Sequence, residues 1–256
     1  MKPTITLISD WRNRDPYLAI FKGQLLDTLS DAHILDITHH IDMFSISQTA
    51  LLMKQSYSYF QEGSFHLLLT NASFTSTFKP VVVKLNNHYF IGEDNGIFRL
   101  MFGNNTELSG WQSTTDMSST SSLQVMIHLV KDILNDNLDA TTAPYNTFKP
   151  SISPEAYHSA FQRQIQGKII YFDAFCNVVT NIPTAMFKEA VKDNPFTATI
   201  KSETQWNIQQ YHENYVPDKA MYLTNNALGL IEAVMYQGKL GILATLSIGD
   251  EIIITY

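Results

Sequence analysis

The sequence contains one cysteine, Cys176, and few charged residues, which make up only 16% of its 256 positions. A single cysteine excludes an intrachain disulfide and favours a reducing compartment. No apolar run approaches the about 18 residues of a membrane-spanning helix, and the first residues lack the apolar region of a signal peptide. We therefore expect a soluble, cytoplasmic protein with no membrane partner.

Basic clusters and several common motifs are also missing. The net charge is −7 and the pI is about 5.5, so we expect no nucleic-acid partner. The chain has no Walker A sequence, G-x-G-x-x-G, G-x-S-x-G or C-x-x-C. The phosphate-binding, hydrolase and redox chemistries that depend on these motifs are therefore not indicated.

The histidines do not form a convincing metal site. His39 and His40 follow a predicted strand, with Asp36 nearby, but adjacent residues rarely both bind one ion. His66 and His128 stand alone and are expected to be structural. We predict no metal and no cofactor.

The first half of the chain alternates strands with helices. Thr4–Ser9 is a short apolar run, and Tyr17–Thr28 has apolar residues at helical spacing. Further strands are expected at 32–37, 65–69, 81–85 and 88–91, and further helices at 47–60 and 123–134. The polar stretch 103–122 is predicted to be a loop, with Ser122 as the cap of the next helix. This alternation predicts an α/β N-terminal domain over residues 1–140 with a mostly parallel sheet.

A polar, proline-containing stretch divides the chain. Pro144, Pro150 and Pro154 lie within residues 141–166, which we predict to be a linker. After it, β-rich runs follow one another with few helices, at 168–172, 198–200, 221–224, 230–235 and 251–255. This pattern predicts a smaller, β-rich C-terminal domain over residues 167–256.

Two carboxylates follow the first predicted strand. Asp10 stands at its carboxyl end, where open α/β sheets place ligand contacts. A carboxylate there can accept hydrogen bonds from both hydroxyls of a ribose, and the alternative is a loop or helix-capping aspartate. Asp15 precedes Pro16, where an acidic residue is ordinary at a helix start, so it is the weaker candidate.

Four segments carry a resemblance to a known family. They are ITLISDWRNRDPYLAIFKG (5–23), YFIGEDNGIF (89–98), IIYFDAFCNVVTNIP (169–183) and NNALGLIEAVMYQGKLGILATLSIGDEIII (225–254). In order and spacing they resemble the S-adenosyl-L-methionine (SAM) hydroxide adenosyltransferases, relatives of the fluorinase and chlorinase enzymes. The resemblance implies SAM or adenosine as the ligand, without a cofactor. It also implies a homotrimer whose ligand site lies between the N-terminal domain of one subunit and the C-terminal domain of the next.

The catalytic motif of that family is altered in this chain. Its D-P-G-V-G-(x)2-R reads Asn71-Ala72-Ser73-Phe74-Thr75-Ser76-Thr77-Phe78, and its histidine falls within Asp116-Met117-Ser118-Ser119-Thr120. Asn71, Phe78 and Met117 then replace the aspartate, the arginine and the histidine. The resemblance therefore implies that hydrolysis is weak or lost. Asn71 and Ser118 could imitate the small polar shelf of the halide-using relatives, although Phe74 and Phe78 would crowd it.

The second half keeps more of the family pattern. In YFDAFCNVVTNIP the resemblance implies that Asp173 meets the ammonium of the methionine moiety, Phe175 stacks near the purine and Asn177 binds the adenine edge. The alternative is a β-turn in which Asn177 and Asn181 satisfy backbone groups and Phe175 lies in the core. Cys176 stands where the family has glycine.

One family contact is lost in the second half. The family's N-S-x-G reads Asn226-Ala227-Leu228-Gly229, so Ala227 lacks the hydroxyl that meets the methionine carboxylate. The resemblance implies contacts with the ligand at Asp10, Asp15, Phe44, Asn71, Phe74, Ser118, Asp173, Phe175, Asn177 and Ala227.

Three hypotheses follow from the sequence. The first is a protein that binds SAM or an adenosine-type ligand and hydrolyses it slowly or not at all. The second is an active SAM-cleaving or 5′-adenosyl-transferring enzyme with a non-standard nucleophile site. The third is a structural or interaction protein that keeps only the trimeric scaffold.

Overall fold

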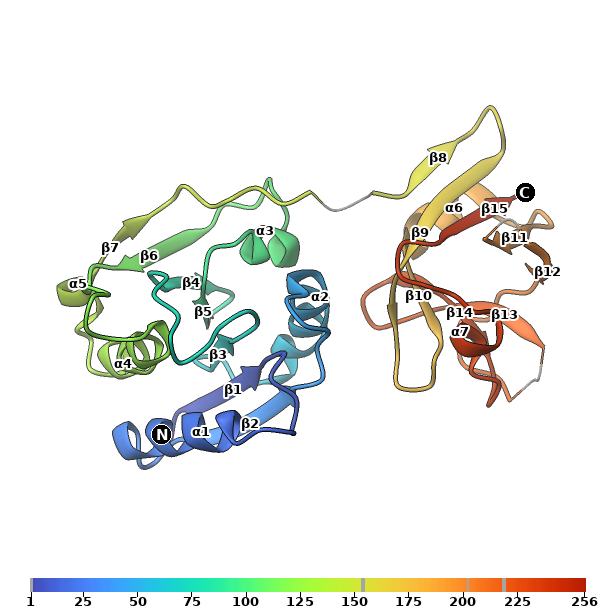
Figure 1. Ribbon diagram of the computed structural model, residues 1–256. Helices are drawn as coiled ribbons and strands as arrows, with labels where there is room; N and C mark the ends of the chain where they lie inside the picture. Colours follow the sequence, from blue (N-terminus) through green and yellow to red (C-terminus); the bar gives the residue numbers. More distant parts are fainter. Residues whose placement is uncertain (1, 153–154, 202, 218–219) are drawn as a thin grey trace. The chain divides into compact units, whose positions relative to one another are not determined.

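The computed structural model describes residues 2–152, 155–201, 203–217 and 220–256 (Figure 1). They form two compact units, Met1–Ile152 and Ser153–Tyr256. Each unit has a hydrophobic core of its own.

Unit 1 is built on a seven-stranded sheet with the order β2-β1-β3-β5-β4-β6-β7. Its strands are β1 (Thr4–Ile8), β2 (His33–Thr38), β3 (Phe65–Leu68), β4 (Val81–Leu85), β5 (His88–Gly92), β6 (Ser109–Ser113) and β7 (Thr142–Tyr145). Its helices are α1 (Tyr17–Thr28), α2 (Ile46–Ser56), α3 (Ile97–Phe102), α4 (Ser122–Leu134) and α5 (Leu138–Thr141), with a 3₁₀ turn at Tyr57–Tyr59. Helices α1 and α4 pack on one face of the sheet, and α2 and α3 pack on the other.

The sheet is mixed, so the prediction of a mostly parallel sheet is wrong in this respect. Strands β2, β1, β3 and β5 are parallel, whereas β4, β6 and β7 pair antiparallel. The physical reason is the two-residue connection Asn86-Asn87, whose φ angles are 50° and 60°. Two residues with positive φ form a tight hairpin, and such a short connection can join only antiparallel strands.

The stretch 103–122, predicted to be a loop, contains strand β6. Its sequence, SGWQS, has little apolar character, and the strand is identified by its pairing with β4 and β7. Helix α4 begins with a capping box formed by Ser121 and Gln124. Ser122, the predicted cap, instead donates a hydrogen bond to the carbonyl oxygen of Phe78 at 2.6 Å.

Unit 2 is an antiparallel β-structure with the order β12-β11-β15-β9-β10-β14-β13, and β8 pairs with β9. Its strands are β8 (Tyr157–Ser159), β9 (Gln164–Phe172), β10 (Val178–Pro183), β11 (Thr197–Ile200), β12 (Glu203–Ile208), β13 (Met221–Asn225), β14 (Leu230–Met235) and β15 (Glu251–Thr255), with helices α6 (Thr184–Val191) and α7 (Leu240–Leu243). The β-rich character predicted for this part of the chain is confirmed. The stretch 141–166 contains β7, β8 and the start of β9.

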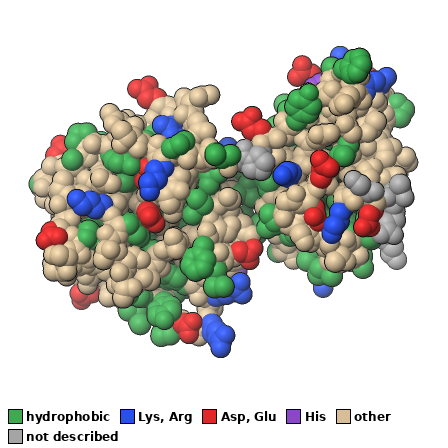
Figure 2. All heavy atoms as spheres, turned by 45° about the horizontal axis from the view of Figure 1, so that its top comes forward, with side chains coloured by type: hydrophobic (Ala, Val, Ile, Leu, Met, Phe, Trp, Pro, Cys, Tyr) green, Lys and Arg blue, Asp and Glu red, His purple; other side chains and the backbone are tan. Residues whose placement is uncertain are grey.

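Charged side chains are scattered over the one face of the molecule that Figure 2 shows. On the face in Figure 2, the Lys and Arg side chains of the described residues lie apart from one another, among hydrophobic and acidic side chains. Among the described residues, no helix combines the length and the apolar character needed to cross a membrane.

Two of the buried histidines of unit 1 lie next to each other. His66 and His88 are 0% and 4% exposed, and Nε2 of His66 lies 3.1 Å from Nδ1 of His88. The second ring nitrogen of His66 lies 2.7 Å from the hydroxyl of Thr6. Burial, and to a lesser extent the neighbouring His88, lowers the pKa of His66 to about 3, and burial also lowers the pKa of His88. Both rings are therefore neutral in the folded protein at neutral pH.

We expect stability to fall as the pH is lowered because of these histidines. In the unfolded chain His66 binds a proton below its ordinary pKa of about 6.5. In the folded chain it stays neutral until about pH 3, so acidification favours the unfolded state. From pH 7.5 to 5, His66 should remove about 2 kcal/mol from the free energy of unfolding. Urea denaturation across this range should show a smaller loss for His66→Gln. His128→Gln, at an exposed position of α4, should keep the wild-type slope; equal slopes for all three proteins would contradict the prediction.

Candidate functional site

In unit 1, Asp10 joins the loops that follow three neighbouring strands. It comes after β1, and one of its carboxylate oxygens accepts the backbone N–H of Phe44 at 2.8 Å and that of Asn71 at 3.2 Å. Phe44 lies in the loop after β2, and Asn71 follows β3. The structure thus brings these three predicted positions together at the carboxyl edge of the parallel strands, where open sheets bind ligands.

This edge is also strained. Arg12, Phe44 and Asn71 have φ angles of 59°, 65° and 61°, in the left-handed region that costs about 1–3 kcal/mol for residues other than glycine. Phe44 is in addition 68% exposed. A large apolar side chain held in solvent by a strained backbone has no stabilising role, and such features concentrate at binding sites.

A chain of polar side chains runs from the buried Ser9, next to Asp10, to the exposed Asp36. Ser9 is 0% exposed, and its hydroxyl lies 2.7 Å from Nδ1 of His39. Nε2 of His39 lies 3.2 Å from Asp36, which also pairs with Lys22 at 2.6 Å. Burial lowers the pKa of His39, although Asp36 acts in the opposite direction. Because Ser9 is fully buried, this Ser-His-Asp arrangement holds the loop of Asp10 and does not present a nucleophile.

The altered motif lines a small pocket in unit 1, with a volume of about 290 Å³. Phe74, Met117 and Ser118 are among its walls. Phe74 is stacked on Trp11 with ring centroids 6.0 Å apart, and Phe78 and Met117 pack against the hydrophobic core. The described residues that line the pocket are Gln24, Phe74, Thr75, Ser76, Thr77, Met117, Ser118, Ser119, Thr120, Ser121 and Gln124, and none of them is ionisable.

Four predicted ligand positions of unit 1 lie outside this pocket: Asp10, Asp15, Phe44 and Asn71. Asp15 is exposed just before α1, and Asn71 is exposed in the loop after β3. Neither is among the residues that line the pocket. Of the residues that do, Ser118 donates its backbone N–H and its hydroxyl to the carboxylate of Asp116, at 3.0 and 2.8 Å. These two hydrogen bonds lower the pKa of Asp116, the one from the backbone having the larger effect.

In unit 2, the turn between β9 and β10 is organised by Asp173. One carboxylate oxygen accepts the backbone N–H of Phe175 at 2.9 Å and that of Asn177 at 2.8 Å, and the other accepts the amide of Asn177 at 2.9 Å. Cys176 closes the turn by donating its N–H to the Asp173 carbonyl, with a φ of 61°. Asp173 therefore shapes this turn, and the Asn177 side chain bonds to Asp173 and not to a backbone group in it. The core position considered for Phe175 is wrong, because its side chain is 76% exposed.

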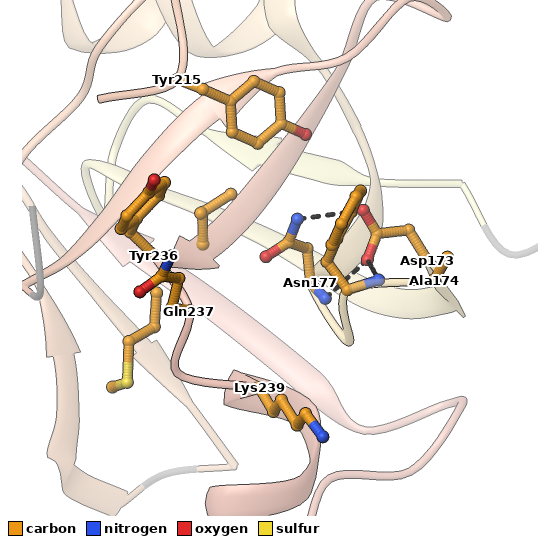
Figure 3. Close-up of a pocket in the computed structure, with 10 residues that line it drawn as sticks. Asp173, Ala174, Asn177, Tyr215, Tyr236, Gln237 and Lys239 are labelled. Atoms are coloured by element: carbon orange, nitrogen blue, oxygen red, sulfur yellow. Dashed lines mark hydrogen bonds between the residues drawn. The ribbon is translucent and has the colours of Figure 1, made fainter. Parts of the chain in front are cut away.

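This turn lines a cavity of about 650 Å³, within the range of about 300–1,000 Å³ that small ligands occupy. Figure 3 shows Asp173 and Asn177 side by side on the β9–β10 turn, with Tyr236 and Gln237 across from them at the end of β14. The remaining lining residues are Ala174, Phe175, Tyr215, Val234, Met235 and Lys239. Asp173, Phe175 and Asn177 thus converge on one cavity. Ala227 does not line it and is exposed in the turn between β13 and β14.

The loop after β14 has little conformational freedom. Gln237 and Lys239 have φ angles of 56° and 48°. Between them, a Cβ at Gly238 would lie 2.2 Å from the sulfur of Met235, so a larger residue would displace the Met235 side chain. The N–H of Gly241 donates to the carbonyl of Cys176 at 2.9 Å. The two loops that line the cavity are therefore fixed to one another.

Sequence reasoning missed a buried acid beside this cavity. Glu232 on β14 is 3% exposed and accepts a hydrogen bond from the Tyr215 hydroxyl at 2.7 Å. Burial raises the pKa of Glu232, and the charge of Asp173 acts in the same direction. The signal was present in the sequence, because Glu232 interrupts the apolar strand LIEAVM and a buried acid beside a cavity is a candidate functional group.

We expect Cys176→Gly to be more stable than Cys176→Ala. Both variants remove the thiol, but only glycine adopts a φ of 61° without steric cost, so their free energies of unfolding should differ by about 1 kcal/mol. Urea denaturation of the two proteins measures this difference. Equal midpoints would show that the left-handed conformation is not strained here.

Comparison with known proteins identifies the family. The model of the SAM hydroxide adenosyltransferase N-terminal domain matches residues 5–135, and that of the C-terminal domain matches residues 167–253. The chain is 32% identical over 99 residues to an (R)-S-adenosyl-L-methionine hydrolase of Methanocaldococcus jannaschii, covering 37% of each protein. It is 26% identical over 100 residues to an (R)-S-adenosyl-L-methionine hydrolase of Thermus thermophilus, covering 39% of this chain and 38% of that protein. These matches thus span well under half the length of either relative.

Solved structures share the fold. An uncharacterized conserved protein from Thermotoga maritima superposes with a TM-score of 0.82 at 17% identity, covering 98% of this chain and 100% of the other. A conserved hypothetical protein from Thermus thermophilus gives a TM-score of 0.69 at 17% identity, covering 98% and 99% of the two chains. Because the two domain models together match most of the chain, this protein belongs to the SAM hydroxide adenosyltransferase family.

Proposed function

We propose that this protein binds SAM or an adenosine-type ligand and that its hydrolysis of SAM to adenosine and L-methionine is weak or lost. Membership of the family and the names of the two hydrolase relatives support the ligand class. The cavity of unit 2 supports binding, because it is large enough for a nucleoside and is lined by aromatic and polar side chains.

The observation that carries the proposal is the absence of ionisable side chains among the described residues lining the unit 1 pocket. Displacement at C5′ of SAM needs a nucleophile held in line with a leaving group that is already good. Without an ionisable group, the pocket has no general base to deprotonate water, and loss of acid–base assistance alone removes about 10²–10⁴-fold of rate. Phe74 and Met117 occupy part of the space instead.

Asp10 and Asp173 would supply the main polar contacts with the ligand. Asp10 would bind the ribose hydroxyls and Asp173 the ammonium of the methionine moiety. Each carboxylate already accepts backbone N–H groups, but a carboxylate has about four acceptor positions, so both retain capacity for a ligand. We propose a homotrimer as the assembly in which the ligand is bound, on the basis of the family resemblance.

The pocket also supports a second candidate, an enzyme that uses a different nucleophile. Hydroxyl groups of Thr75, Ser76, Thr77 and Ser118 line it, and a shelf of neutral hydroxyls can hold a small anion by hydrogen bonds. Such an enzyme would transfer the 5′-adenosyl group to that anion.

Incubation of the purified protein with SAM, followed by chromatography and calorimetry, tests these alternatives. We expect binding without release of adenosine above the buffer blank. Release of adenosine well above the blank, or of another 5′-adenosyl product when halide is added, would favour the second candidate. Absence of both binding and turnover would leave a scaffold protein.

We expect Asp10→Asn to weaken adenosine binding by about ten- to a hundred-fold, because hydrogen bonds to a charged group contribute about 1.5–3 kcal/mol. Asparagine keeps one oxygen for the N–H groups of Phe44 and Asn71, so the loops should remain folded. Calorimetry gives the dissociation constant, and Asp27→Asn, an exposed change on α1, should leave it unchanged. An unaltered constant for Asp10→Asn would rule out the ribose role.

We expect the double variant Asn71→Asp with Phe78→Arg not to hydrolyse SAM, because Met117 still stands at the position of the family's histidine. Adding Met117→His should raise adenosine release above the double variant. Circular dichroism must show that the variants fold, since Phe78 packs against the core. Robust adenosine release from the double variant alone would show that the third replacement is unimportant.

A further inference from the structure

Glu232 is buried next to the cavity of unit 2 without lining it, and it contacts residues that do. It lies in the middle of β14, between β10 and β13, opposite Val179 on one side and Thr224 on the other. Burying a carboxyl group among strands is costly unless its oxygens have partners. An apolar residue would stabilise this position more simply, so the acid has another use.

Its partners all belong to the cavity. The Tyr215 hydroxyl, at 2.7 Å, comes from a residue of the cavity wall. The Asn177 side chain contacts Glu232 as well, and the charge of Asp173 acts on it. Glu232 itself is not among the residues that line the cavity. It therefore touches the residues that would contact a ligand, and it does not touch the ligand.

The orientation of Asn177 shows what this contact achieves. Its amide nitrogen donates to Asp173 at 2.9 Å, and Figure 3 shows this nitrogen directed at Asp173 and the amide oxygen directed away from it. A side-chain amide is symmetric in shape, so its two ends are distinguished only by their hydrogen-bond partners. Asp173 and Glu232 together supply partners that hold the Asn177 side chain in one place.

We propose that Glu232 is the positioning residue of this cavity: fixed by the Tyr215 hydroxyl, it contacts Asn177 and so holds the Asp173–Asn177 turn in the shape that receives the ligand. The proposal rests on the proposed function for the identity of that ligand. The direction of the Glu232 pKa agrees with this placement, because burial raises it and the charge of the neighbouring Asp173 acts in the same direction.

The single cysteine provides a direct probe of the turn. Cys176 is half-buried within it, so the rate at which a thiol reagent modifies Cys176 reports how often the turn opens. This rate is measured without a ligand. Failure of the proposed function would appear as absent adenosine binding in the wild-type protein, and failure of the positioning role would appear in the thiol rates.

We expect Glu232→Leu to raise the modification rate of Cys176 by about five-fold or more and to weaken adenosine binding about ten-fold, because a buried hydrogen-bond partner is lost. Glu232→Gln keeps an oxygen for Tyr215 and should stay within about two-fold of wild type in both measurements. Tyr215→Phe should also raise the thiol rate. If Glu232→Leu does not fold, the thiol rate of Tyr215→Phe tests the positioning role instead.

Thr180→Val is the matched control. Thr180 is fully buried and donates to the Ile231 carbonyl at 2.7 Å, so it joins the same two strands away from the turn. This variant should lose stability without changing the thiol rate. The proposal is overturned if Cys176 reacts at the wild-type rate in folded Glu232→Leu and Tyr215→Phe. It is equally overturned if Thr180→Val or Glu232→Gln accelerates the reaction as much as Glu232→Leu.

Discussion

The bonds between Asp10 and two backbone N–H groups determine the geometry of the unit 1 site. Phe44 and Asn71 belong to loops that follow different strands, and both have positive φ angles. Their strained conformations persist because the buried Ser9–His39 pair, which ends at the exposed Asp36, fixes the strand end that carries Asp10. A carboxylate that accepts main-chain donors is well suited to this task, since charge-assisted hydrogen bonds are stronger than neutral ones.

In unit 2, which has a different fold, an aspartate also accepts two backbone N–H groups of a loop. Asp173 accepts the N–H groups of Phe175 and Asn177, and the turn contains Cys176 at positive φ. In both units the carboxylate expected to meet the ligand also shapes the loop around it. A ligand would therefore meet groups that are already in place, which lowers the entropy cost of binding. The same dual use means that substituting either aspartate by alanine would confuse binding with loop order, and asparagine is the more informative change.

The altered motif of unit 1 lacks charge, whereas carboxylates remain at the predicted binding positions of both units. Phe74 and Met117 line the unit 1 pocket, and Phe78 packs against the core. Ionisable groups with perturbed pKa values remain elsewhere, among them Glu232 beside the unit 2 cavity and the His66–His88 pair in the core. Of these three residues, Glu232 is the one whose neighbours belong to a candidate ligand site.

The sequence by itself determined the elements with strong periodicity and the motifs with fixed local spacing. The strand before Asp10, the helix at 122–134 and the β-rich second half follow from apolar patterns, and the Asp173–Asn177 turn follows from residues within five positions of one another. The tertiary structure decided what depends on distant pairing. Strand β6 exists because β4 and β7 flank it, and the sheet is mixed because Asn86-Asn87 closes a hairpin. Glu232 meets Tyr215 only across the fold. Local patterns cannot specify such contacts, because their free energy comes from burial and hydrogen bonds between segments that are far apart in the chain.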